Sequence, residues 1–208
     1  MGHELEVTKR WTQLSAPAVQ SADWNSKTLY NLLPAGRRSG KTELFKRKLV
    51  RRALLGTKFD NARFFAAAPT FQQAKRIYWQ DLKRLIPKHF IQGKPSETDL
   101  VIRLINGSEI YVVGMDKPER IEGQPWDGGG LDEYANMKAE AWGANIQPAL
   151  ADRNGWCDFL GVPEGRNHYY EQAKIAQADK SGLWSYFHWI SADILPPEVI
   201  QRAKDTLD

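Results

Sequence analysis

The chain has 208 residues, a length that suits one α/β domain with a continuous buried core. Apolar residues make up 42% of it and charged residues 26%, a balance that excludes a disordered chain. No apolar run approaches the roughly 20 residues of a membrane span, and the start lacks the apolar core of a secretory signal, so a cytosolic protein is expected. The formal charge of +4 is compatible with a polyanion partner but does not require one. We expect a lead-in over residues 1–26 and one domain over residues 27–208.

The first predicted elements of that domain alternate between strand and helix. A buried strand at 28–33 leads through a loop with two glycines into a helix that Gly56 ends. A second short strand at 63–68 is followed by a long helix over 70–86, which a threonine caps and a proline stops. This alternation is typical of a sheet with parallel strands.

A hairpin interrupts the alternation before it resumes. Apolar segments at 101–104 and 109–113 flank Asn106-Gly107, a dipeptide that strongly favours a tight antiparallel turn. The remaining strands and helices are expected at 128–131, 137–142, 156–161, 168–178, 183–190 and from Pro196 onward. The predicted fold class is therefore α/β: a central, mostly parallel sheet flanked by helices, with an inserted antiparallel hairpin.

The loop between the first strand and its helix carries the strongest chemical signal, and it reads Ala35-Gly36-Arg37-Arg38-Ser39-Gly40-Lys41-Thr42. The backbone amides of such a loop, together with the start of the next helix, form a concave site for the phosphates of ATP. Gly36 and Gly40 allow the tight turn. Lys41 supplies a positive charge to the β- and γ-phosphates, and the Thr42 hydroxyl is placed to hold Mg²⁺. The usual pattern begins with glycine, and Ala35 stands in that place.

An acidic pair is expected at the end of another strand, because Mg²⁺ needs a nearby carboxylate and the attacking water needs a base. Asp132 is predicted to hold Mg²⁺ through water, and Glu133 to polarise the water that attacks the γ-phosphate. Glycines at 128–130 replace the branched apolar residues usual in such a strand, so a solvated acidic turn is the alternative interpretation. The charge that develops on the γ-phosphate also calls for a cation, for which the candidates are Arg37, Arg38, Arg120 and Arg166.

Five segments follow one another between about residues 28 and 200. They are the loop at 35–42, Ala68-Pro69-Thr70-Phe71-Gln72-Gln73-Ala74, Glu119-Arg120-Ile121-Glu122-Gly123, Leu131-Asp132-Glu133-Tyr134-Ala135 and Gly161-Val162-Pro163-Glu164-Gly165-Arg166-Asn167. In order and spacing they resemble the ATPase domain of tailed-bacteriophage large terminases. The phosphate loop joined to the Pro-x-Gly-Arg-Asn element is far more specific than either alone.

The resemblance implies an ASCE-type P-loop NTPase fold, with the acidic pair on a strand adjacent to the phosphate-loop strand. It implies that Arg37 or Arg38 acts within its own subunit, whereas Arg120 matches the region that reaches a neighbour's nucleotide. Gln20, with Gln13 behind it, matches a glutamine that meets the adenine. The motif that couples phosphate release to movement matches Gly161, Pro163, Gly165, Arg166 and Asn167.

By the same resemblance, the chain hydrolyses ATP with Mg²⁺ to move double-stranded DNA into a procapsid, in the cytoplasm of the host cell. The implied partners are DNA, the portal of the procapsid, the small terminase subunit and further copies of the chain in a pentameric ring, with a monomer as the alternative for the isolated domain. Full-length large terminases carry a nuclease domain after the motor. The residues that follow the predicted motor are too few for one, so we expect no DNA-cleaving activity here.

Three other classes share parts of this pattern. A superfamily-2 helicase has both ATP motifs, but it places Ser-Ala-Thr where Gly161-Val162-Pro163 stands and needs a second RecA-like domain. A small-molecule kinase would show an arginine-rich lid, which we do not find. A nucleotide-dependent assembly module binds without turnover and has little use for Glu133. GTP is disfavoured because no Asn-Lys-x-Asp tetrad is present.

Overall fold

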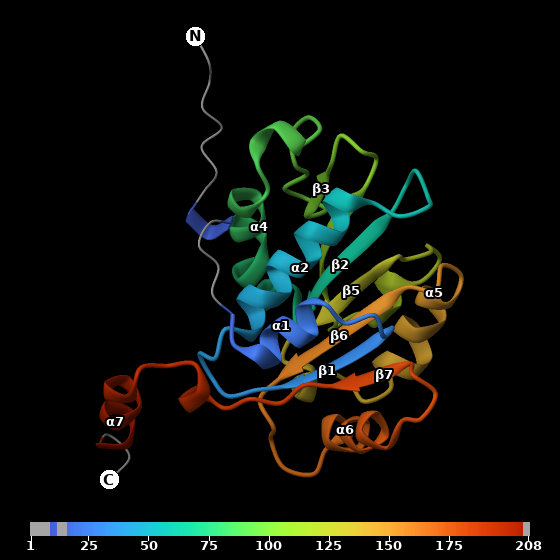
Figure 1. The fold of residues 1–208 in the computed structure, drawn as a ribbon. Coiled ribbons are helices and arrows are strands. Elements are labelled where there is room, and N and C mark those ends of the chain that lie inside the picture. Colours follow the sequence, from blue (N-terminus) through green and yellow to red (C-terminus); the bar gives the residue numbers. More distant parts are fainter. Residues whose placement is uncertain (1–8, 12–15, 206–208) are drawn as a thin grey trace.

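A mixed sheet with helices on both faces makes up the fold (Figure 1). The computed structural model describes residues 9–11 and 16–205. Its strands are β1 (Tyr30–Pro34), β2 (Arg63–Ala68), β3 (Val101–Arg103), β4 (Glu109–Gly114), β5 (Gly128–Leu131), β6 (Trp156–Gly161) and β7 (Trp184–Tyr186). Its α-helices are α1 (Ala18–Trp24), α2 (Lys41–Leu55), α3 (Phe71–Ala74), α4 (Gln80–Leu85), α5 (Gln147–Ala151), α6 (His168–Ala178) and α7 (Pro197–Asp205).

Shorter helical turns complete the described elements. Two are wide π-type turns, at Lys75–Trp79 and Ala141–Ile146. The 3₁₀ turns lie at Lys9–Trp11, Lys88–Phe90, Pro118–Ile121, Tyr134–Asn136 and Ser191–Asp193. No helix of the described residues is both long and apolar enough to cross a membrane.

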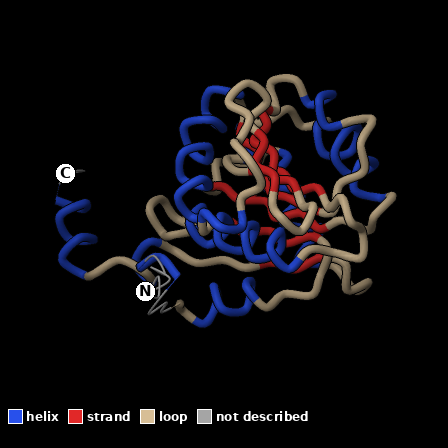
Figure 2. Tube along the Cα trace, turned by 90° about the horizontal axis from the view of Figure 1, so that it is seen from above, coloured by secondary structure: helices blue, strands red, loops and turns tan. Residues whose placement is uncertain are grey.

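The strands lie in the order β3-β4-β2-β5-β6-β1-β7, and every neighbouring pair is parallel except β3 and β4. This confirms the predicted α/β class and its hairpin. Helices α2 and α4 cover one face and α5 and α6 the other, so that the strands lie between two helical layers (Figures 1 and 2). Because β1, β5 and β6 are parallel, the segments that follow them emerge at one edge of the sheet, which is where the predicted phosphate loop and acidic pair stand.

The expected adjacency of the acidic pair's strand to the phosphate-loop strand is wrong. Strand β6 lies between β1 and β5 and pairs with both. All residues of β6 are buried, and a strand buried along its whole length favours a central place in a parallel sheet. The acidic pair is therefore two strands away from the loop.

Two predicted elements differ from the observed ones. The helix expected at 137–142 begins only at Ala141, because Met137 has an extended backbone (φ −88°, ψ 167°). The Met137 side chain nevertheless packs in the same hydrophobic cluster as Ala141 and Trp142. The strand expected at 183–190 ends at Tyr186. Leu32 still accepts a hydrogen bond from the Phe187 amide, but Pro34, the next donor position on β1, has no N–H to continue the ladder.

The other predicted elements are found within a few residues of their expected bounds. The helix expected over 70–86 is a continuous helical run that Thr70 caps reciprocally with Gln73, and the wide turn at Lys75–Trp79 interrupts its regular pitch. Within the described part of the lead-in, the chain forms the 3₁₀ turn at Lys9–Trp11 and helix α1.

The glycines of β5 have a packing reason. A Cβ at Gly128 would meet the Trp156 ring, one at Gly129 the Phe65 ring and backbone, and one at Gly130 the Phe45 ring, all within 2.6 Å. Aromatic rings thus occupy the space that branched side chains take in other strands. β5 is fully buried and pairs with β2 and β6, so it is a central strand rather than a solvated turn.

A buried charge cluster ties α1 to the sheet. Lys48 on α2 donates hydrogen bonds to Asp23 at 2.8 Å and Asp158 at 2.9 Å, and all three side chains are fully buried. Asn31 on β1 donates to the same Asp158. Burial, and then the charge of Asp158, raises the pKa of Asp23 to about 6. The cluster fixes α1 against α2, which holds α1 beside the phosphate loop.

We predict that Gly130→Ala destabilises the fold, because its Cβ would lie 2.3 Å from a Phe45 ring carbon. Overpacking of this kind costs about 1–3 kcal/mol. Denaturant unfolding measures the loss. Gly143→Ala is the matched control: it lies in a helical turn with no atom within 4 Å of its Cβ, so its stability should be unchanged or higher. A Gly130→Ala protein as stable as the wild type would contradict the packing account.

Candidate nucleotide and metal site

The loop at 35–42 forms a concave backbone site. It leaves β1 at Pro34 and enters α2 at Lys41. Arg38 (φ 58°) and Gly40 (φ 82°) both have left-handed backbone conformations, with Ser39 between them. Alternation of this kind turns successive N–H groups toward one side and makes a nest for an anion. The adjacent N-terminus of α2, a helix of 15 residues, adds its positive dipole end.

Side chains inside the loop hold its shape. The Ser39 hydroxyl donates to the Gly36 carbonyl at 2.6 Å, and the Lys41 ammonium donates to the same carbonyl at 3.5 Å. Lys41 is buried, with 6% of its surface exposed. The ammonium therefore lies over the loop rather than in solvent, where it can meet a phosphate bound in the nest.

The acidic pair meets the loop across the edge of the sheet. The Thr42 hydroxyl donates to Asp132 Oδ2 at 2.9 Å, and the Tyr78 hydroxyl donates to the same oxygen at 2.9 Å. The Glu133 amide donates to the other oxygen, Asp132 Oδ1, at 3.1 Å. Asp132 is thus a buried carboxylate oriented by three donors. Hydroxyl and carboxylate oxygens are the ligands that Mg²⁺ prefers, so these residues fit a magnesium ion held jointly with phosphate oxygens.

Tyr78 was not predicted from the sequence. It lies in the helical run that was expected over 70–86, but one residue in that run gives no signal of a contact with a distant aspartate. Burial, followed by the charge of Asp132, raises the pKa of Tyr78 well above its ordinary value. Tyr78 therefore stays protonated and remains a donor to Asp132.

Glu133 is half-buried at the same edge. It has a left-handed backbone (φ 54°, ψ 44°), which is unusual for a residue other than glycine and is often found at functional sites. Burial raises the pKa of Glu133, and the charges of Asp132 and Glu164 raise it further. The positive charges of Lys41 and Arg37 oppose this shift. A carboxylate with a raised pKa is a better proton acceptor than an exposed one.

The candidate arginines fall into separate places. Arg37 and Arg38 are exposed on the loop itself, and the Arg37 charge acts on Glu133. Arg166 is exposed in the segment after β6. Arg120 is not brought to the loop: its guanidinium lies 6.0 Å from the centre of the Phe71 ring, in a different cavity.

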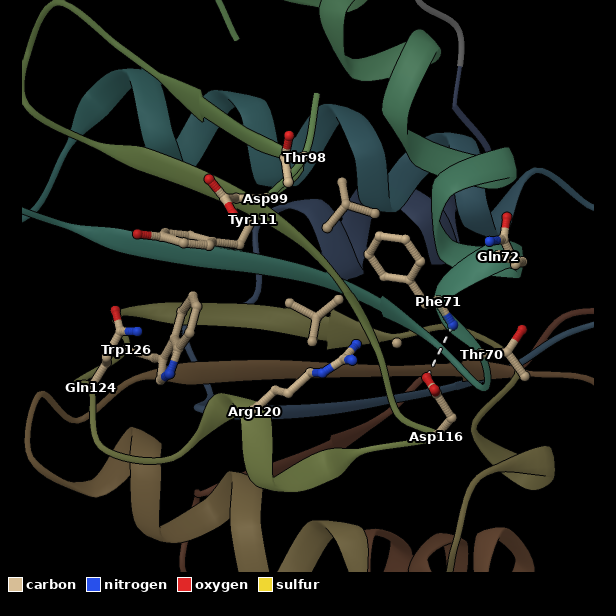
Figure 3. Close-up of a pocket in the computed structure, with 13 residues that line it drawn as sticks. Thr70, Phe71, Gln72, Thr98, Asp99, Tyr111, Asp116, Arg120, Gln124 and Trp126 are labelled. Carbon is tan, nitrogen blue, oxygen red and sulfur yellow. Dashed lines mark hydrogen bonds between the residues drawn. The ribbon is translucent and has the colours of Figure 1, made fainter. Parts of the chain in front are cut away.

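That cavity has a volume of about 610 Å³ and is lined by β4 residues Tyr111 to Gly114 and by the segment that follows β2. Figure 3 shows Arg120 within it beside Phe71, Asp116, Tyr111 and Trp126, and Asp116 accepts a hydrogen bond from the Phe71 amide at 3.1 Å. Strands β2, β5 and β6 lie between β4, which lines this cavity, and β1, which leads into the loop, so Arg120 and the phosphate loop lie over different parts of the sheet.

Gln20 lies on α1 directly against the loop. Its side-chain amide donates to the Ser39 carbonyl at 3.0 Å, and only 8% of its surface is exposed. It also lines a cavity of about 520 Å³ between α1 and the start of α2, beside Trp24 and Gly40. The other glutamine candidate, Gln13, is outside the described residues.

The predicted coupling segment connects β6 to α6. Gly161 ends β6 and pairs with Pro34, at the base of the loop. Gly165 has φ 67°, and Asn167 caps α6 by accepting hydrogen bonds from two backbone amides. Pro163 and Arg166 are exposed. The segment thus runs from the base of the phosphate loop past Glu133 to the start of a surface helix.

The carboxylates of this site do not form a dense metal cluster. In the part of the chain that the structure describes, no group of three or more histidine, cysteine, aspartate or glutamate side chains is placed to hold a metal ion.

Known proteins similar to this chain are terminase large subunits. The sequence profile of the family described as "Terminase large subunit, T4likevirus-type, N-terminal" matches residues 32–204. The large terminase subunit of Thermus phage G20c is 26% identical over 171 residues, which cover 74% of this chain and 35% of that protein. The large terminase subunit of Thermus virus P23-45 gives the same values. The chain therefore spans about a third of the length of these curated relatives.

Solved structures resemble the fold over nearly the whole chain. The large terminase ATPase domain of Thermus phage P74-26 has a TM-score of 0.78 and 22% identity, over 93% of this chain and 88% of that one. The large terminase of bacteriophage D6E, solved with ADP, has a TM-score of 0.74 and 20% identity, over 90% of this chain and 49% of that one. At these identities the likeness shows that the fold is shared.

We predict that the pKa of Glu133 lies above the ordinary value of a glutamate, and that Glu164→Gln lowers this pKa, because one of the negative charges that raise it is removed. Titration of the side-chain carboxyl carbon by NMR measures both. Glu171→Gln, an exposed change on α6, should leave the Glu133 pKa unchanged. A Glu133 that titrates in the ordinary range would show that the site is more open to water than described.

Proposed function

We propose that this chain hydrolyses ATP to move double-stranded DNA into a viral procapsid. The premise is its family: the chain belongs to the T4-like terminase large-subunit N-terminal domains. The single observation that carries the proposal is the 2.9 Å hydrogen bond from the Thr42 hydroxyl to Asp132. It brings the last residue of a phosphate loop to the acidic pair of a different strand. Loop, lysine, hydroxyl, aspartate and glutamate are the parts that P-loop hydrolysis needs in one place.

The nucleotide is ATP in this proposal. The nest at Arg38–Gly40 and the α2 N-terminus bind the phosphates, and the Lys41 ammonium neutralises the β- and γ-phosphates. The cavity beside Gln20 takes the adenine, with Gln20 Oε1 accepting from its amino group while the side-chain amide stays on Ser39. The large terminase of bacteriophage D6E has been solved with ADP and with ATP-γ-S, which supports this choice.

Mg²⁺ is the proposed metal. Thr42 would ligate it directly through its hydroxyl, and Asp132, held in place by Tyr78, would orient its water ligands. When bound, the ion neutralises charge on the phosphate oxygens. The hydrogen bond from Tyr78 keeps Asp132 Oδ2 facing Thr42, so the chain presents this oxygen without having to reorganise.

Glu133 is the proposed base. Its carboxylate accepts a proton from the attacking water, and its raised pKa strengthens it as an acceptor. The nearby charges of Lys41 and Arg37 keep the ionised form accessible, because both lower the Glu133 pKa. Hydrolysis should therefore fail as the pH falls through the raised pKa, since protonated Glu133 cannot accept the proton.

Two sets of arginines stabilise the negative charge that develops on the γ-phosphate in the transition state. Arg37 or Arg38, on the loop itself, acts on the nucleotide of its own subunit. Arg120, which lines a separate cavity beside Phe71, acts on the nucleotide of a neighbouring subunit in a pentameric ring. This division needs an assembly, so turnover should rise steeply with protein concentration.

Movement and partners complete the proposal. Loss of the γ-phosphate changes the contacts of Glu133. This change moves the segment at 161–167, which ends at the cap of α6. DNA is gripped through its phosphate backbone without regard to sequence. The proposed partners are the portal of the procapsid and the small terminase subunit, and the domain over residues 27–208 works in the host cytoplasm.

The test of this function is Glu133→Gln together with Arg120→Ala. Each variant alone should lose at least about 100-fold in ATP turnover with ATP-γ-S affinity kept, because each loses a group that acts in the transition state. Mixed at high concentration, they should recover activity: an intact site in one subunit then meets an intact arginine from the next. The measurement is steady-state phosphate release, with and without long duplex DNA, which should raise the wild-type rate.

Glu140→Gln is the control, since this glutamate is exposed and lies away from the loop, and it should turn over ATP like the wild type. A Glu133→Gln protein that hydrolyses ATP normally would end the catalytic assignment. If the mixture stays inactive while each variant still assembles, Arg120 does not act on the nucleotide of a neighbouring subunit.

A further inference from the structure

A segment near the end of the described chain contacts the outer side of the phosphate loop. The Trp189 indole N–H donates to the Ser39 carbonyl at 3.0 Å, and the Ser191 hydroxyl donates to the Arg37 carbonyl at 2.7 Å. The Gly36 amide donates in turn to the Trp189 carbonyl at 3.2 Å. We refer to residues 187–194 as the strap. The strap thus makes three hydrogen bonds to the loop, at Gly36, Arg37 and Ser39.

These bonds fix the directions of loop peptides. In a trans peptide the C=O and the following N–H point in opposite directions. With the Ser39 carbonyl held outward by Trp189 and by Gln20, the Gly40 N–H faces inward. With the Arg37 carbonyl held outward by Ser191, the Arg38 N–H faces inward. The strap therefore determines where two of the nest's donors point.

Trp189 anchors the strap in the core. Trp189 is 1% exposed and packs with Leu33, Ala35 and Leu44, at the junction of β1 and α2. A Cβ on Gly36 would lie 2.3 Å from the Ser191 oxygen. Glycine at this position therefore allows the strap to approach the loop closely, in addition to allowing the loop to turn.

We propose that Trp189 and Ser191 are positioning residues for triphosphate binding. Through Ser39 and Arg37 they hold the Gly40 and Arg38 amides toward the phosphates before the nucleotide arrives, so that binding does not have to order them. The inference rests on the proposed function, because it assumes that the loop binds a triphosphate. It adds two residues to the nucleotide site that belong neither to the phosphate loop nor to the acidic pair.

The test is Trp189→Phe, which keeps an aromatic ring in the apolar cluster and removes the N–H. Calorimetric titration with Mg²⁺ and ATP-γ-S should show affinity reduced about three- to tenfold, as expected for one lost hydrogen bond. Inorganic pyrophosphate, which can occupy only the phosphate part of the site, should lose affinity by the same factor. Ser191→Ala should behave alike, and the double variant should lose more than either.

Trp184→Phe is the matched control. It makes the same substitution on β7, where the ring packs against Tyr30 and Phe159, away from the loop, and it should leave both affinities unchanged. The melting temperatures of the two variants without nucleotide should agree, which separates positioning from folding.

Three outcomes overturn the inference. Trp189→Phe with unchanged ATP-γ-S affinity would show that the strap does not preorganise the loop. A loss for ATP-γ-S without a loss for pyrophosphate would show that the tryptophan acts on the base or on packing. A wild-type chain that binds neither ligand would overturn the proposed function as well, whereas normal wild-type binding beside an unaffected variant overturns this inference alone.

Discussion

The hydrogen bond between Thr42 and Asp132 depends on how closely α2 can lie on the sheet. Asp132 directly follows β5 and Thr42 lies in the first turn of α2, and a whole strand, β6, separates β5 from the strand that leads into the loop. The two side chains meet because α2 crosses β6 toward β5. Phe45, one turn along α2 from Thr42, lies where a side chain on Gly130 would be. The glycine strand thus lets the helix descend far enough for the hydroxyl to reach the carboxylate.

The same close packing organises the rest of the site. Tyr78 reaches Asp132 from the helical run at 71–85, and its ring packs edge-on against Phe45 at 6.0 Å between centroids. Lys48, on the same face of α2, anchors α1 through Asp23, and α1 in turn presents Gln20 to the loop. Helix α2 is therefore the element on which the loop, the acidic pair and the proposed adenine-binding cavity all depend.

The parts of the fold and of the site that depend on neighbouring residues could be predicted from the sequence. The phosphate loop, the Asn106-Gly107 turn and the Thr70 cap each follow from a few neighbouring residues, and the structure contains the turns and the cap at those places. The acidic pair was found by its place after a strand. The strand order was not, because whether β6 or β5 lies beside β1 is decided by the packing of whole faces rather than by any local pattern. Tyr78, Trp189 and Ser191 were missed for the same reason: their partners lie 54, 150 and 154 positions away in the sequence.

The central claim is that the loop at 35–42 binds the phosphates of a magnesium-bound nucleotide, with Lys41 as its buried cation. The most direct measurement is calorimetric titration of wild type and Lys41→Ala with Mg²⁺ and ATP-γ-S, after unfolding curves have established that both proteins are folded. We expect one binding site in the wild type and an affinity lower by at least about tenfold in the variant, because a charge-assisted contact is lost. Equal affinities in the two proteins would contradict it.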